Sequence, residues 1–96
     1  MGGLANAGCL VYSAAVKAGM TDPKMIQQAR EWGVKEGYIS NGNYVKIGRE
    51  QLVQKFADHF GTTINTDMRI IQGTGHFYVR DSHGNEFNSG GVGFHH

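Results

Sequence analysis

The sequence has few of the features that mark secreted, membrane-bound or disulfide-rich proteins. It contains one cysteine, Cys9, which cannot form an internal disulfide, and this suits a reducing compartment. No apolar run approaches the roughly 18 residues that a membrane span requires. The first residues lack the basic start and the long apolar stretch of a secretory signal. We therefore expect a cytoplasmic protein with no membrane partner, or one exported by a route that needs no signal.

The sequence also lacks an excess of charge of either sign. Nine lysines and arginines are interleaved with eight aspartates and glutamates, which gives a formal net charge of +1. The stretch from Thr21 to Lys46 would allow two helices around a hairpin, as in a winged-helix nucleic-acid reader. Its basic residues are Lys24, Arg30, Lys35 and Lys46. Most of their charge is offset by three acidic residues, Asp22, Glu31 and Glu36. We keep nucleic-acid binding only as a second alternative, because such proteins usually carry a basic patch.

Hydrophobic residues make up 40% of the chain, enough for one core, and we expect a single domain over residues 1–96. Helical spacing predicts three helices. The first runs from about Gly8 to Lys17, with Asn6 as N-cap and Gly19 as its stop. The second starts at Pro23, capped by Thr21 or Asp22, and ends at Gly33 or Gly37. The third covers residues 49–60 and stops at Gly61. Between the second and third helices, Asn41-Gly42 is typical of a tight primed turn in a hairpin.

After Gly61 the apolar pattern changes to a period of two, which is typical of strands. Residues 62–65, 68–72, 75–81 and 85–90 predict three or four strands, antiparallel because their connections are too short for crossovers. Helices first and strands last indicate an α+β fold, with N-terminal helices packed on a C-terminal antiparallel sheet.

The strand that begins near His76 carries polar residues on one face. His76, Tyr78 and Arg80 alternate with Phe77 and Val79, so His76 lies on the face away from the apolar pair. A three-residue loop, 82–84, with Gly84 left-handed, would place Asn88 opposite Tyr78 and on the face of His76. A two-residue loop would place Asn88 on the other face. The sequence favours the three-residue loop.

A cysteine at a helix N-terminus, a histidine on a strand and an amide on the next strand suit nucleophilic catalysis. The helix dipole and a neighbouring imidazolium would favour the thiolate of Cys9. His76 would carry the proton, and Asn88 would orient its imidazole. Backbone N–H groups of Gly8 and Cys9, helped by the Asn6 side chain, would bind a developing oxyanion.

Two stretches, AGCLVYSAAVKAG (7–19) and GHFYVRDSHGNEFN (75–88), resemble the cysteine helix and histidine hairpin of compact papain-like cysteine hydrolases. These include the NlpC/P60, CHAP and C39-like peptidases and amidases. In the NlpC/P60 type a polar residue follows the histidine by about twelve positions, as Asn88 follows His76. The resemblance implies that Cys9 is the nucleophile, His76 the general base and Asn88 the orienting residue. The implied substrate is an amide bond in a peptide or in peptidoglycan.

Other features favour a non-catalytic member of the same fold, acting as a binding or inhibitory module for a protein partner. The residues around the nucleophile are Gly-Cys-Leu, and the glutamine that C39-like members place upstream is absent. A lone cysteine is also often a buried small hydrophobe. We expect no metal and no cofactor, because the cysteine and the histidines His59, His76 and His83 have no close metal-ligand spacing.

Overall fold

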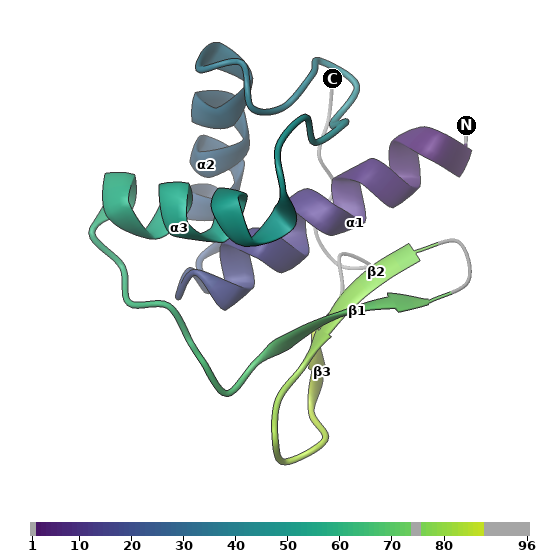
Figure 1. Ribbon diagram of the computed structural model, residues 1–96, viewed down its shortest axis with the longest axis vertical. Helices are drawn as coiled ribbons and strands as arrows, with labels where there is room; N and C mark the ends of the chain where they lie inside the picture. The colour runs from purple at the N-terminus through teal and green to yellow at the C-terminus, as the bar shows by residue number, and fades with distance from the viewer. Residues whose placement is uncertain (1, 74–75, 88–96) are drawn as a thin grey trace.

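The computed structural model describes residues 2–73 and 76–87, with side chains from Cys9 onward. Within these ranges three helices precede three strands (Figure 1). They are α1 (Gly2–Lys17), α2 (Pro23–Lys35), α3 (Arg49–Phe60), β1 (Arg69–Gly73), β2 (His76–Arg80) and β3 (Glu86–Phe87). The strands form one antiparallel sheet in the order β1-β2-β3. The predicted α+β class is confirmed.

Helix α1 occupies the centre of the molecule. It crosses the view in Figure 1 with α2 and α3 on one side and the strands on the other. It contacts both other helices, and it is the helix that principally contacts β2 and β1. The core around it joins all three helices to β2 and includes Val11, Ala14, Ala15, Ala18, Ile26, Ala29, Leu52, Val53, Phe56 and Val79. No helix in the described part of the chain is long and apolar enough to cross a membrane.

Helix α1 begins six residues earlier than the sequence predicts, at Gly2 instead of Gly8. The prediction that Asn6 caps the helix is wrong, because Asn6 lies inside it. Residues 2–8 include Leu4, Ala5 and Ala7, which are strong helix formers, and no proline interrupts them. The helix ends as predicted before Gly19, whose φ is +102°. There the N–H of Met20 donates to the carbonyl of Ala15 at 3.1 Å.

The start of α2 and the end of α3 match the sequence signals. Asp22 is the N-cap of α2, and its Oδ1 accepts a hydrogen bond from the N–H of Lys24 at 2.9 Å. Gly61 follows α3 in the left-handed region with φ 68°. Gly33 does not end α2, because the helix continues to Lys35. Gly33 is instead a packing position, where an added Cβ would lie 2.5 Å from Cδ1 of Ile39.

The turn between α2 and α3 differs from the predicted two-residue Asn41-Gly42 turn. Asn43 is the residue in the left-handed region, with φ 67°. The N–H of Asn43 donates to the carbonyl of Ser40 at 2.9 Å, and the N–H of Ser40 donates to the carbonyl of Tyr44 at 2.8 Å. The chain therefore reverses through a three-residue loop, and only one bridge, Ile39 with Val45, closes it among the described residues.

The segment 62–65, predicted as a strand, is irregular. The N–H of Asn65 donates to the carbonyl of Lys17 at 2.7 Å, so this segment joins the end of α1 instead of the sheet. A carbonyl in the last turn of a helix has no partner within the helix, which explains why a passing backbone N–H is favoured there.

Candidate functional site

Cys9 lies in the middle of α1, not at its N-terminus. Its side chain is partly exposed. Helical spacing places it on one face with Ser13 and Val16, which are 0% and 5% exposed. Cys9 is therefore more accessible than the residues that follow it on this face of α1. The field of a helix end falls off within the first turn, so the expected stabilisation of the thiolate by the helix dipole is wrong.

The new start of α1 also changes the predicted oxyanion site. The backbone N–H groups of Gly8 and Cys9 lie inside the helix. Such groups donate to carbonyls four residues earlier, so they are not available to a substrate oxygen. Oxyanion binding by these two N–H groups stays a prediction, and it would require this turn of α1 to open. A contribution from the Asn6 side chain stays a prediction.

His76 is exposed and begins β2, opposite Gly73 of β1. The hairpin that follows has the predicted three-residue loop. Val79 pairs with Phe87, the N–H of Asp81 donates to the carbonyl of Asn85 at 3.0 Å, and φ of Gly84 is +85°. The register prediction is confirmed over the described residues. Asn88, the predicted orienting residue, lies outside the residues that the structure describes.

The two faces of the sheet have opposite character. Val79 is fully buried, and its neighbours across the sheet, Ile70 and Phe87, pack against the same core. His76 and Arg80 are exposed and lie on the other face. As predicted, His76 is on the face away from the apolar pair of β2.

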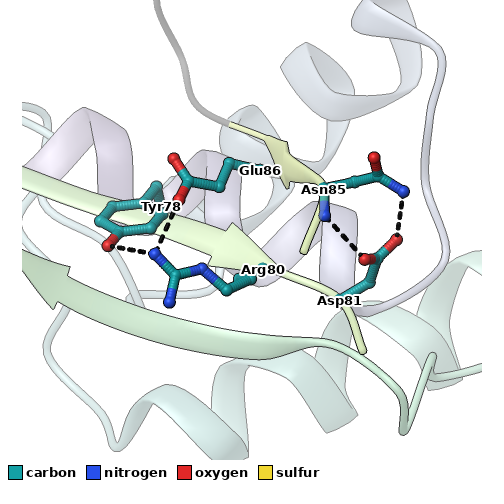
Figure 2. A network of polar contacts seen from close by, with 5 residues as sticks. All are labelled: Tyr78, Arg80, Asp81, Asn85 and Glu86. Carbon is teal, nitrogen blue, oxygen red and sulfur yellow. Dashed lines mark hydrogen bonds and ion pairs between the residues drawn. The ribbon is translucent and has the colours of Figure 1, made fainter. Parts of the chain in front are cut away.

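A chain of contacts runs along the polar face from His76. The rings of His76 and Tyr78 stack with centroids 5.3 Å apart and an interplanar angle of 26°. Figure 2 shows the continuation: Nη2 of Arg80 lies between the Tyr78 hydroxyl, at 3.4 Å, and Oε2 of Glu86, at 2.7 Å. The bond to Glu86 raises the pKa of Arg80 above its ordinary value, so the guanidinium stays charged. Strand alternation predicts this shared face, but it does not reveal the stack.

The turn after β2 is held by the Asp81 carboxylate. It accepts hydrogen bonds from the backbone N–H of Asn85 at 2.9 Å and from Nδ2 of Asn85 at 3.1 Å (Figure 2). It also accepts one from the backbone N–H of His83 at 2.9 Å. Partial desolvation raises the pKa of Asp81, but the hydrogen bonds from Asn85 and His83 outweigh it and leave that pKa below its ordinary value. His83 thus serves the turn through its backbone, as a turn residue should.

The structure brings the elements that carry Cys9 and His76 together. Helix α1 contacts β2, and in Figure 1 both run in the same direction across the view. The first half of α1 and the beginning of β2 therefore lie toward the same side of the molecule. Within the described ranges, no group of three or more His, Cys, Asp or Glu residues is arranged to hold a metal ion.

The basic residues of the winged-helix alternative include one that already has partners. Nε of Arg30 donates to Oδ1 of Asn43 at 2.6 Å, and its Nη2 donates to the carbonyl of Asn41 at 2.7 Å. Arg30 is therefore engaged by the neighbouring loop instead of facing a phosphate backbone. The residues between α2 and α3 form a single bridge, which is less than the paired strands of a wing.

Comparison with known proteins gives no relative for this chain. No family model, no curated protein and no solved structure matches it. The papain-like resemblance therefore rests on the two sequence motifs alone.

Proposed function

We propose that this protein is a small cysteine hydrolase that cleaves an amide bond in a peptide or in peptidoglycan. The observation that carries the proposal is the contact between α1, which holds a partly exposed Cys9, and β2, which begins with an exposed His76. A reachable thiol and a reachable imidazole on neighbouring elements are the minimum that this chemistry requires.

The reaction would proceed in two steps. The Cys9 thiolate attacks the carbonyl carbon, the C–N bond breaks, and the imidazolium of His76 gives its proton to the departing amine. Water then attacks the thioester, His76 accepts a proton from that water, and the carboxylic acid leaves as the C–S bond breaks. The Cys9 thiolate and the His76 imidazolium are regenerated, and no cofactor is consumed.

The third member of the site depends on the register of the last strand. Val79 pairs with Phe87. Continued by one residue in the same register, this pairing would join Tyr78 to Asn88. The proposal requires the pairing to continue by this one residue. Asn88 would then stand on the face of His76, diagonal to it, where its amide would fix the orientation of the imidazole.

A second candidate function is a non-catalytic binding module for a protein partner. One observation favours it: the face of β2 that is buried with the core is that of Val79, and His76 lies on the opposite face. Catalysis therefore requires the Cys9 thiol to reach the His76 imidazole at the beginning of β2. A binding module has no such requirement.

The pH dependence of Cys9 alkylation by iodoacetamide in the native protein tests the proposal. An ordinary thiol reacts slowly at about pH 6 because little of it is thiolate. We expect rapid alkylation at this pH, slowed in His76→Ala and unchanged in His83→Ala, which removes an exposed histidine from the turn. Peptides and peptidoglycan fragments then serve as substrates, with released amines as the readout. Cys9→Ala should abolish release, and His76→Ala should lower it by about 10²–10⁴-fold.

If Cys9 reacts only after the protein unfolds, or if His76→Ala leaves the alkylation profile unchanged, the hydrolase proposal is wrong. The binding-module candidate would then be preferred.

A further inference from the structure

We propose that Tyr78 and Gly73 are positioning residues that set the orientation of the His76 imidazole for proton transfer. This inference rests on the proposed hydrolase function. Its first support is the stack of the His76 and Tyr78 rings, with centroids 5.3 Å apart and planes 26° from parallel. His76 is exposed at the start of its strand, where a side chain without such support would sample several rotamers.

Tyr78 is itself held from the side away from His76. The guanidinium of Arg80 lies 5.7 Å from the centroid of the Tyr78 ring, and its Nη2 approaches the hydroxyl at 3.4 Å. Glu86 of β3 fixes Arg80 through a 2.7 Å ion pair. The pair is about half exposed, so it contributes little to folding stability. Its geometry instead limits where the Tyr78 ring can move.

Gly73 provides the space that the imidazole occupies. It pairs with His76 across β1 and β2. A Cβ at this position would lie 3.2 Å from Cε1 of His76 and 3.4 Å from Cε1 of Tyr78, so the imidazole would have to shift by a few tenths of an ångström. Glycine weakens a strand and is often found where another group approaches the backbone closely. At Gly73 the approaching groups are the rings of His76 and Tyr78.

The arrangement has a chemical use because proton transfer depends on the direction of the ring nitrogens. Misplacing a reacting group by about 1 Å can cost about a hundredfold in rate. The charged and titratable groups around His76 are distributed over the neighbouring elements. On the face of the sheet that His76 shares they are Arg69 of β1, Tyr78 and Arg80 of β2 and Glu86 of β3, and of these Tyr78 stacks on the imidazole.

The test combines the pH profile of Cys9 alkylation with the proton NMR signals of the His76 ring. Tyr78→Leu removes the stack, whereas Tyr78→Phe keeps the ring and loses only the hydroxyl. Tyr44→Leu is the matched control, because Tyr44 is 71% exposed on the loop between α2 and α3. Gly73→Ala tests the space requirement without changing either ring. Thermal unfolding of each variant verifies that it is folded.

We expect Tyr78→Leu and Gly73→Ala to slow alkylation at about pH 6 by about tenfold, and Tyr78→Phe to stay within about twofold of the parent protein. The His76 ring signals should lose their ring-current shift in Tyr78→Leu and keep it in Tyr78→Phe. Tyr44→Leu should change neither readout.

Two failures are distinguishable. If His76→Ala slows alkylation but Tyr78→Leu and Gly73→Ala do not, the positioning role is wrong and the hydrolase proposal stands. If His76→Ala has no effect on alkylation, the hydrolase proposal is wrong, and the positioning role is wrong with it.

Discussion

Replacing Arg30 by alanine should destabilise the protein through a residue that lies outside the candidate site. Arg30 of α2 donates through Nε to Oδ1 of Asn43 at 2.6 Å and through Nη2 to the carbonyl of Asn41 at 2.7 Å. Asn43 is 1% exposed and adopts a φ of 67°. The guanidinium therefore satisfies a buried amide oxygen and holds a loop residue in the left-handed region.

The magnitude follows from burial. A charge-assisted hydrogen bond to a buried acceptor contributes about 1.5–3 kcal/mol, because the acceptor is left unsatisfied when the donor is removed. The bond to the Asn41 carbonyl is exposed, so water can replace it at little cost. We expect Arg30→Ala to lower the free energy of unfolding by about 2–3 kcal/mol. For a domain of this size, Tm should fall by roughly 8–20 °C.

Urea unfolding, followed by the fluorescence of the single tryptophan, Trp32, measures this loss. Lys24→Ala is the matched control, because it removes an exposed cation from the same helix and should change stability by less than about 0.5 kcal/mol. Asn43→Gly tolerates the left-handed conformation while it removes the acceptor. In that background Arg30→Ala should cost at least about 1 kcal/mol less than in the parent protein. The hydrogen bond from Arg30 to Asn43 would not be the source of the stability if Arg30→Ala and Lys24→Ala lowered the free energy of unfolding equally. The same conclusion would follow if Arg30→Ala lowered it equally in the parent protein and in Asn43→Gly.

Two further changes test the backbone near α1 and the turn after β2. Gly19→Ala should lower the free energy of unfolding in urea more than Gly61→Ala does. Both glycines have positive φ, but only at Gly19 would an added Cβ clash with the carbonyl oxygen of Thr63. Similar losses in the two variants would contradict this. Asp81 has a folded pKa below its unfolded value of 3.8, because hydrogen bonds from Asn85 and the turn backbone outweigh desolvation. Its stabilising effect is therefore present above pH 3.8 and is lost as pH falls through the folded pKa. The parent protein should lose more stability than Asp81→Ala over this acid range, and parallel stability–pH curves would be evidence against the role of the carboxylate.

Local signals in the sequence predict several elements correctly. Asp22-Pro23 marks the start of α2, Gly61 marks the end of α3, and Gly84 selects the three-residue turn of the β2–β3 hairpin. Each of these depends on the conformational preference of one or two residues and their neighbours, so no distant contact is needed to predict it.

The errors occur where local signals are weak or where distant residues compete for the backbone. The predicted start of the first helix is about Gly8, yet α1 extends through the preceding glycines to Gly2. The segment 62–65 has the alternation of a strand, but the N–H of Asn65 bonds to the end of α1. Asn43 takes the left-handed position expected in the Asn41-Gly42 turn, where Arg30, thirteen residues away, binds its side chain.

Sequence alone was enough to predict which residues of β2 share a face and how the β2–β3 turn is closed, because strand alternation and turn geometry depend on adjacent residues. It therefore placed His76, Tyr78 and Arg80 together. The contact between α1 and β2 could not be predicted in this way, because it joins residues far apart in the chain and depends on how the buried faces of α1 and the sheet pack around one core. The early start of α1 at Gly2 and the closeness of Gly73 to the His76 ring were also seen only in the folded protein, since neither has a distinct local signal.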